Sequence, residues 1–283
     1  DGESALLEGS QRVGEVSLPV AGASAFKSVF DREVRDARSS GNAVLGVYAG
    51  DSYLASAAIQ CSFPLTGTTE PVYDAIAQRQ MPYSAHILGN HEFDFGPNFL
   101  ARFIRNFTIN GVLQQPFLSA NLDFSQTPAF NGLIREGGIV VGVSTKGDVV
   151  ARSLVHTDQR TGARFGVVAA TTELLRTISS PDTVLVTTDN VTETATLVQG
   201  EINRLQNDFG VNKIIFVSHL QGVRFDEQLI ALVSDIDIAV AGGGDELLGT
   251  PDVVIPGDAG RQQRATGDIG RQLPLPWPPR CCI

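Results

Sequence analysis

Short apolar runs alternate with segments of helical periodicity along most of the chain. The apolar runs, several of them bounded by turn residues, predict buried strands at residues 43–49, 85–88, 116–120, 164–170, 213–217 and 236–241. Residues 23–39 and 194–209 instead place their apolar side chains at helical spacing. This alternation of strands and helices predicts an α/β fold with parallel strands.

Two segments depart from this alternation. Residues 137–164 contain the apolar runs 139–143 and 149–154 together with turn residues, which predicts antiparallel hairpin structure inside the same domain. After about residue 257 the periodicity is lost and the chain becomes rich in proline. We therefore predict one domain over residues 1–257 and an irregular C-terminal extension over residues 258–283.

Four of the predicted strands run directly into polar residues. In open α/β sheets, binding sites form outside the carboxyl ends of the strands, so polar residues at these positions are expected to converge. The residues in question are Asp51 after the first strand, Asn90, His91, Glu92 and Asp94 after the second, His219 after the fifth, and Asp245 and Glu246 after the sixth.

The side chains at these positions are imidazoles, carboxylates and an amide, which are the ligands that divalent cations favour. Taken singly, each has a simpler interpretation. Asp51 is typical of a helix cap or turn, and His219 of a hydrogen-bonded loop histidine. Residues 242–244 resemble a phosphate loop but lack its lysine and spacing. The gathering of such residues after four separate strands favours a metal site, whereas His86 and His156 are interpreted as structural.

Composition excludes several classes of function. The formal net charge of −10 argues against binding a nucleic-acid polymer by bulk charge. Two of the three cysteines are adjacent near the end of the chain, so neither a disulfide framework nor a cysteine-based zinc site is predicted. No run of about 18 apolar residues predicts a membrane span, and no signal peptide is recognised. The oligomeric state is not predicted by any feature of the sequence.

Residues 89–96 read Gly-Asn-His-Glu-Phe-Asp-Phe-Gly, which is similar to the signature of the 5'-nucleotidase branch of the calcineurin-like metallophosphoesterases. Gly50-Asp51 and Ser218-His219 resemble two further blocks of that family, and the segments beginning at Ser119 and Thr171 resemble others. The resemblance implies a sandwich of two mixed β-sheets flanked by helices. It also implies hydrolysis of a small phosphate monoester, a nucleotide by analogy, and a periplasmic or extracellular location.

The same resemblance implies roles for individual residues around two divalent metal ions. Asp51 would bridge the two ions, Asn90 and His219 would bind the second ion, and Asp1 would bind the first. His91, held by Asp94, would not bind metal. It would stabilise the phosphoryl transition state or assist the leaving oxygen.

The chain departs from the family pattern at both metal sites, and at the second site a ligand is lost through Gly243. Glu3 stands where the family has a histidine, and Gly243 and Asp245 stand at two further histidine positions. A shift of one residue in register would place Glu246 at the second of these positions. The candidate ligands of the first site are therefore carboxylates, with Glu3 and Asp245 among them. Among Mn, Mg, Ca and Zn, this favours a hard ion at the first site.

Two alternatives to an active phosphoesterase stay open at this point. The altered ligands are also typical of a degenerate, catalytically inactive family member that binds a phosphorylated ligand or partner. An unrelated α/β binding domain without a metal site would leave Asp51, Asn90 and His219 far apart. The family's second, nucleobase-binding domain has no counterpart in these 283 residues, which leaves the nucleotide specificity open.

Overall fold

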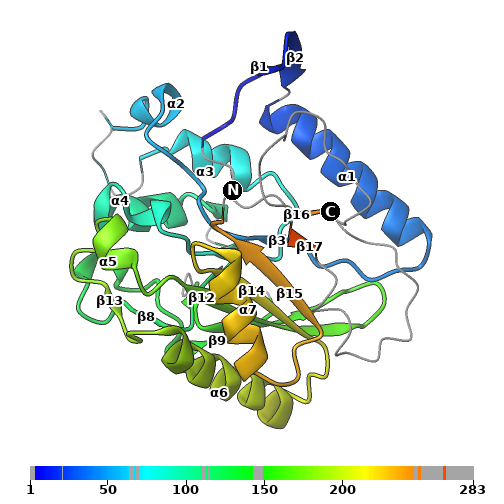
Figure 1. Cartoon of the computed structure of the whole chain (residues 1–283), viewed down its shortest axis with the longest axis vertical. Coiled ribbons are helices and arrows are strands. Elements are labelled where there is room, and N and C mark those ends of the chain that lie inside the picture. Colours follow the sequence, from blue (N-terminus) through cyan, green and yellow to red (C-terminus); the bar gives the residue numbers. More distant parts are fainter. Residues whose placement is uncertain are drawn as a thin grey trace.

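Two β-sheets packed face to face form the centre of the fold, with helices on the outside (Figure 1). This is a computed structural model, and it describes residues 4–20, 22–63, 67, 70–109, 112–113, 115–142, 149–244, 248–249 and 264–265. The first sheet has four strands in the order β10 (Val150–Ala151), β7 (Phe117–Leu118), β4 (Ala85–Ile87) and β3 (Val47–Tyr48). All three pairings in this sheet are parallel.

The second sheet has five strands and is mixed. Its order is β15 (Ile238–Gly242), β14 (Ile214–His219), β12 (Arg164–Thr171), β11 (Ser153–Thr157) and β9 (Ile139–Val141). The β11–β12 pair is antiparallel, and the other three pairs are parallel. The predicted arrangement of two β-sheets flanked by helices is therefore confirmed.

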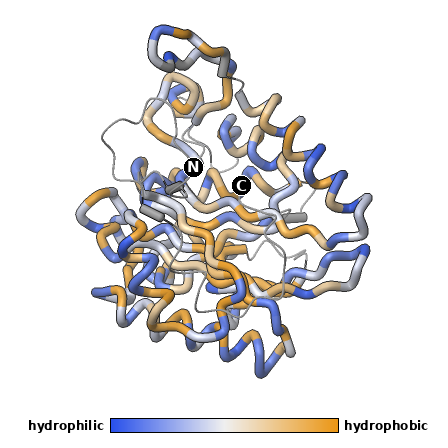
Figure 2. The backbone as a smooth tube through the Cα atoms, turned by 45° about the vertical axis from the view of Figure 1, so that its right-hand side comes forward, coloured by the Kyte–Doolittle hydropathy of each residue, from blue (hydrophilic) through white to orange (hydrophobic). Residues whose placement is uncertain are grey.

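The alternation of side chains along the central strands explains why two separate cores form. In β14, Ile215 and Val217 face the other sheet, whereas Ile214 and Phe216 face helix α6. Successive residues of a strand point to opposite faces, so a strand that is apolar throughout buries both of its faces. Figure 2 shows the resulting concentration of apolar residues along the central strands.

Helices cover the outer faces of both sheets. The outer face of the five-stranded sheet packs on α6 (Val191–Phe209) and α7 (Val223–Leu232). The four-stranded sheet packs on α4 (Gly96–Arg105). The remaining helices are α1 (Ala23–Ser39), α2 (Ala57–Gln60), α3 (Tyr73–Gln78), α5 (Leu175–Ile178) and the 3₁₀ helices η1 (His91–Phe93), η2 (Pro128–Phe130) and η3 (Glu136–Gly138). Among the described residues, no helix is long and apolar enough to cross a membrane.

Four two-stranded pairs complete the described elements. They are β1 (Gly9–Val13) with β2 (Val16–Val20), β5 (Thr108–Ile109) with β6 (Val112–Leu113), β8 (Leu122–Asp123) with β13 (Leu185–Val186), and β16 (Leu248–Gly249) with β17 (Arg264–Ala265). Apart from β17, the predicted extension at 258–283 lies outside the described residues, so the domain boundary at 257 stays a prediction.

The local signals at α6 explain its limits. The side chain of Asn190 accepts a hydrogen bond from the backbone N–H of Glu193, which caps the first turn. Gly210 ends the helix in the left-handed conformation that glycine adopts without steric cost. The prediction of a helix over residues 194–209 is therefore confirmed, and the Asn190 cap places its start three residues earlier, at Val191.

Two expectations from the sequence need correction. The apolar runs 139–143 and 149–154 do not form a hairpin with each other, because the second run divides at Arg152. Its first part forms β10 in one sheet, and β11 begins in the other sheet, where it runs parallel to β9. The antiparallel hairpin of this region joins β11 to β12 instead. The predicted strand 43–49 is reduced to β3, since the backbone N–H of Val44 donates to the Asp158 carboxylate at 3.1 Å rather than to a strand.

The predicted helix over residues 23–39 is confirmed, but its apolar stripe is only partly covered. No side chain of α1 is fully buried. Phe26 is 50% exposed and Val29 47% exposed. Phe30 packs edge-on against Tyr83, with ring centroids 5.2 Å apart. Helix α1 is therefore held to the body of the molecule by a small part of its apolar face.

Candidate functional site

The carboxyl ends of three parallel strands bring together residues that are distant in sequence. His219 is the last residue of β14, Asn90 follows β4 after a two-residue turn, and Asp51 follows β3. All three side chains are buried. The described residues contain no group of three or more His, Cys, Asp and Glu side chains that could hold a metal. The cluster instead combines one imidazole, one carboxylate and one amide oxygen.

His219 lies at the centre of this cluster with a defined orientation. Its Nδ1 atom lies 2.7 Å from the carbonyl oxygen of Ala49. A carbonyl oxygen can only accept, so Nδ1–H donates, and whenever the ring is neutral its lone pair is on Nε2. That Nε2 atom lies 3.0 Å from Asp51 Oδ2 and 3.1 Å from Asn90 Oδ1. Three possible metal ligands thus converge around one point, and the donor set fits a divalent cation.

Glycine residues allow this close approach. A Cβ atom at Gly50 would lie 2.4 Å from His219 Nδ1, and one at Gly89 would lie 2.4 Å from Asp51 Oδ1. A Cβ atom at Gly243 would lie 2.5 Å from His219 Nε2. Side chains at these positions would collide with the cluster, so the glycines that precede and surround the polar residues are required for its geometry.

Burial and charge act in opposite directions on the cluster. Burial alone would raise the pKa of Asp51, but its hydrogen bond to His219 and the positive charge of that ring lower it below its usual range. Burial alone would lower the pKa of His219, but the contact with Asp51 raises it. Asp51 therefore favours the protonated form of His219, and His219 favours the ionised form of Asp51. The two side chains form a buried pair of opposite charge.

His91 and Asp94 form a second pair beside this cluster. His91 Nδ1 lies 2.6 Å from Asp94 Oδ2, and Ser179 donates to Asp94 Oδ1 at 2.9 Å. The backbone N–H of His91 donates to Asp51 Oδ1 at 3.0 Å, which places the ring next to the cluster. Burial would lower the pKa of His91, but the bond to Asp94 and the charge of Asp51 raise it. The His91 side chain is 31% exposed, so it can meet a ligand.

Glu92 holds the two turns of the site together, a role that the sequence analysis did not assign. It is fully buried, and its carboxylate accepts backbone N–H groups from Gly89 at 2.6 Å, Asp51 at 3.0 Å and Ser52 at 2.5 Å. Burial and the charge of Asp51 raise the pKa of Glu92. Tyr53 donates to the backbone oxygen of Glu92 at 2.6 Å. Glu92 is thus a positioning residue for the turns that carry Asp51 and Asn90. Its place inside the motif at residues 89–96 was the one feature of the sequence that pointed to such a role.

The segments at Ser119 and Thr171 form a buried polar network behind the site. Thr171 Oγ1 donates to the carbonyl of Leu88 at 2.6 Å, and Asn121 Nδ2 donates to the carbonyl of Thr171 at 2.8 Å. Ser119 Oγ lies 2.9 Å from Thr171 Oγ1. These bonds join the carboxyl ends of the two sheets directly beneath the turn that carries Asn90.

The predicted site residues divide into two groups. The structure brings together Asp51, Asn90, His91, Asp94 and His219. The candidate first-site ligands Asp1, Glu3 and Asp245, with Glu246 as the alternative to Asp245, lie outside the described residues. His86 and His156 lie in β4 and β11, away from the cluster.

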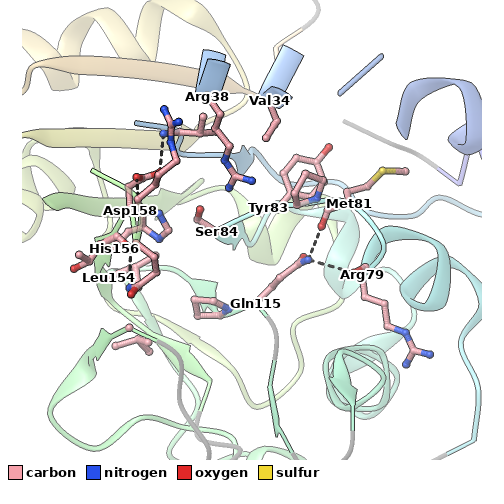
Figure 3. Close-up of a pocket in the computed structure, with 18 of the residues that line it drawn as sticks. Val34, Arg38, Arg79, Met81, Tyr83, Ser84, Gln115, Leu154, His156 and Asp158 are labelled. Atoms are coloured by element: carbon pink, nitrogen blue, oxygen red, sulfur yellow. Dashed lines mark hydrogen bonds between the residues drawn. The ribbon is translucent and has the colours of Figure 1, made fainter. Parts of the chain in front are cut away.

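A separate cavity, lined by described residues, lies elsewhere. It has a volume of about 700 Å³ and opens at the amino ends of β3, β4 and β7 (Figure 3). Arg38, Tyr83, Gln115, His156 and Asp158 are among the residues that line it. None of the predicted site residues is among them, so the convergence of polar ligands, and not the size of this cavity, locates the candidate site.

Comparison with known proteins finds relatives among phosphoesterases and nucleotidases. A trifunctional nucleotide phosphoesterase from Bacillus subtilis is 30% identical over 191 residues, covering 64% of this chain and 12% of that protein. The rat 5'-nucleotidase is 30% identical over 200 residues, covering 68% of this chain and 29% of that protein. The structure of a 5'-nucleotidase precursor from Thermus thermophilus superposes with a TM-score of 0.68 at 27% identity, covering 91% of this chain and 42% of that one.

The chain is related to the 5'-nucleotidase branch of the calcineurin-like metallophosphoesterases. No protein-family model matches it. It spans less than half the length of these relatives. The resemblance carried by residues 89–96 is thereby confirmed over most of the chain, and so is the fold that it implied.

Proposed function

We propose that this chain is the catalytic part of a metal-dependent phosphoesterase that hydrolyses a small phosphate monoester of the nucleotide class. The observation that carries the proposal is the convergence of Asp51, Asn90 and His219 beside the His91–Asp94 pair. The names of the relatives, which include nucleotide phosphoesterases and 5'-nucleotidases, support the substrate class.

Two divalent ions at such a site lower the pKa of a bound water and neutralise phosphate oxygens. Asn90 and His219 would hold the second ion, and Asp51 would contact both. Asp1 would hold the first ion, together with Glu3 and with Asp245 or, in the shifted register, Glu246. The substituted carboxylates favour Mn, Mg or Ca over Zn there.

The protein's own residues would orient the substrate and move a proton. His91 donates from its Nδ1 side to Asp94, so its Nε2 atom is free to face a phosphate or leaving oxygen. The raised pKa of His91 favours the protonated ring, which can donate to developing negative charge. Glu92 would fix the turns that carry Asp51 and Asn90 while the reaction proceeds.

A second candidate function is binding of a phosphorylated ligand without turnover. Gly243, which lies against His219 Nε2 but provides no side chain, favours this alternative because it leaves the second ion with fewer ligands. In either case the ligand is a small phosphate compound rather than a nucleic-acid polymer. A location outside the cytoplasm is part of the proposal, in line with the snake venom 5'-nucleotidases among the relatives.

The test is hydrolysis of 5'-AMP and of p-nitrophenyl phosphate by the purified, EDTA-treated chain, with Mn²⁺, Mg²⁺, Ca²⁺ or Zn²⁺ added back. The proposal expects phosphate release that depends on the added metal. Binding of no more than one ion together with an absence of turnover would favour the ligand-binding alternative. Hydrolysis that is unaffected by EDTA would contradict metal dependence.

A further inference from the structure

The amide of Gln221 reaches into the centre of the cluster. Its Nε2 atom donates to Asn90 Oδ1 and lies 3.2 Å from His219 Nε2. Both of these neighbours are proposed ligands of the second metal ion. The Gln221 amide therefore lies around the same point as Asp51, Asn90 and His219, although Gln221 was not recognised from the sequence.

The backbone at Gln221 directs the side chain to this position. Gln221 follows β14 by two residues and adopts a φ of 63°, which non-glycine residues rarely adopt. Gly222 and α7 follow directly, so the turn between β14 and α7 is short. The side chain turns back toward the strand end instead of extending into solvent, and it is fixed there by Asn90 and His219.

Whether the amide of Gln221 turns its nitrogen or its oxygen toward Asn90 depends on whether a cation occupies the site. Asn90 Oδ1 is an acceptor, and in the structure the amide nitrogen of Gln221 faces it. Rotation of the amide by about half a turn exchanges its nitrogen and oxygen within the same space. A cation between Asn90 Oδ1 and His219 Nε2 repels the amide N–H group and attracts the carbonyl oxygen. An amide oxygen is an accepted ligand for hard divalent cations.

Position 243 provides no competing ligand. Gly243 lacks a side chain, and its Cβ position would lie 2.5 Å from His219 Nε2. Position 243 therefore provides no side chain that could serve as a ligand beside the imidazole. Gln221, which comes from the turn after β14, is a polar side chain whose amide lies 3.2 Å from the same Nε2 atom.

We propose that Gln221 is a ligand of the second metal ion, binding through Oε1 and supplying the ligand that Gly243 does not. This inference rests on the proposed function, because it requires a divalent ion at the site. The second ion would then be held by Asp51, Asn90, His219 and Gln221. An amide oxygen in this set shifts the metal preference of the second site, like that of the first, toward hard ions such as Mn²⁺.

Calorimetric titration of the EDTA-treated full chain with Mn²⁺ tests this ligand directly, without reference to activity. Four proteins are compared: the wild type, Gln221→Ala, Gln221→Glu, and Gln159→Ala as a control in the exposed β11–β12 turn. We expect Gln221→Ala to weaken binding of one ion by about 10-fold or more, while the other ion binds as before. Gln221→Glu should bind at least as tightly as the wild type, and Gln159→Ala should be unchanged.

The melting temperatures of the EDTA-treated variants show whether each substitution preserves the fold. If Gln221→Ala binds both ions with wild-type affinity or tighter, Gln221 is not a ligand, although the proposed function still holds. If the wild type binds no divalent ion, the metal-dependent function and the role of Gln221 both fail. If Gln221→Glu loses affinity as Gln221→Ala does, an oxygen at this position does not bind the ion.

Discussion

The Nε2 atom of His219 lies 3.0 Å from the Oδ2 atom of Asp51, which joins the end of β14 to the turn after β3. This contact connects the two sheets at their carboxyl ends. It depends on the bond from His219 Nδ1 to Ala49 and on the glycines that leave room around the ring. The geometry of the proposed metal site is therefore set by the packing of one sheet against the other.

Gly243 offers a sensitive test of this packing. In Gly243→Ala the new methyl group would lie 2.5 Å from His219 Nε2, so the ring must move and metal affinity should fall by about 10-fold or more. Gly132→Ala is the matched control, because Gly132 has a φ of 77°, close to the 76° of Gly243, and nothing lies within 4 Å of its Cβ position. Both variants carry the same backbone cost, roughly 1–2 kcal/mol.

Metal titration and thermal unfolding of the two glycine variants separate the loss of metal affinity from the backbone cost of the substitution. A loss of metal affinity in Gly243→Ala alone would support the proposed position of the ion. Any loss of unfolding free energy beyond that of Gly132→Ala would measure the collision with the His219 ring. Equal metal affinities in both variants would mean that Gly243 does not face a metal site.

His91 is predicted to act in catalysis without binding metal. His91→Ala should lower kcat by about 10²–10⁴-fold, the usual contribution of a general acid or base. Metal stoichiometry, measured by elemental analysis, should stay at the wild-type value. Asp94→Asn should have a smaller effect, since it removes the partner of Nδ1 but leaves the ring in place. A metal ion lost together with the activity in His91→Ala would reassign His91 as a ligand.

His86 should make the fold sensitive to acid. The buried ring packs against four aromatic side chains, those of Tyr48, Tyr83, Phe107 and Phe117. Its Nε2 atom lies 2.5 Å from Oε1 of Gln115. Burial lowers the pKa of His86 to about 4, from an ordinary value of 6.5. Between these two values the unfolded chain binds a proton that the folded protein does not. Stability is therefore lost as the pH falls from about 6.5 to about 4, by about 1.4 kcal/mol for each unit of pKa difference.

The variant His86→Phe tests this contribution, because it keeps an aromatic ring in the same cluster. Its free energy of unfolding should fall less steeply than that of the wild type between pH 6.5 and pH 4.5. The lost bond to Gln115 lowers stability at every pH and leaves the slope unaffected. Identical slopes in the two proteins would mean that His86 is not buried in its neutral form.

The metal preference follows from the carboxylates that replace imidazoles. Activity should be supported by Mn²⁺, Mg²⁺ or Ca²⁺ better than by Zn²⁺. The double variant Glu3→His with Asp245→His should raise zinc affinity at the first site. Both positions lie outside the described residues. Calorimetric titration of the wild type and the double variant with Zn²⁺ measures the change in affinity. Tight zinc binding at two sites in the wild type, without preference for harder ions, would show that these residues do not line the site.

Much of the fold followed from periodicity, because strands buried on both faces and amphipathic helices leave distinct patterns. The apolar run containing β14 and the helical spacing of α6 both appeared in the sequence at close to their final limits. The division of the run 149–154 between two sheets could not be predicted from the sequence, because tertiary packing determines which strand each part pairs with. Hydropathy alone contains no information about that choice.

The site was predicted where a residue follows a strand or belongs to a recognisable motif. Asp51, Asn90 and His219 were identified in this way, and the structure brings them together. Gln221 and Ser179 were not identified, because each lies in an ordinary turn sequence and acquires its contacts only when the chain folds. Glu92 lay inside the motif, but its three backbone hydrogen bonds depend on a turn that is distant in sequence.

The most direct test of a two-metal phosphoesterase is the metal content and 5'-AMP hydrolysis of Asp51→Asn beside the wild type. Asp36→Asn, on an exposed position of α1, serves as the charge-matched control. One carboxylate would serve both ions, so we predict that Asp51→Asn weakens both metals and abolishes hydrolysis. Asp36→Asn should match the wild type in both measurements. Unchanged hydrolysis in Asp51→Asn, with the metal content of the wild type, would contradict the two-metal account.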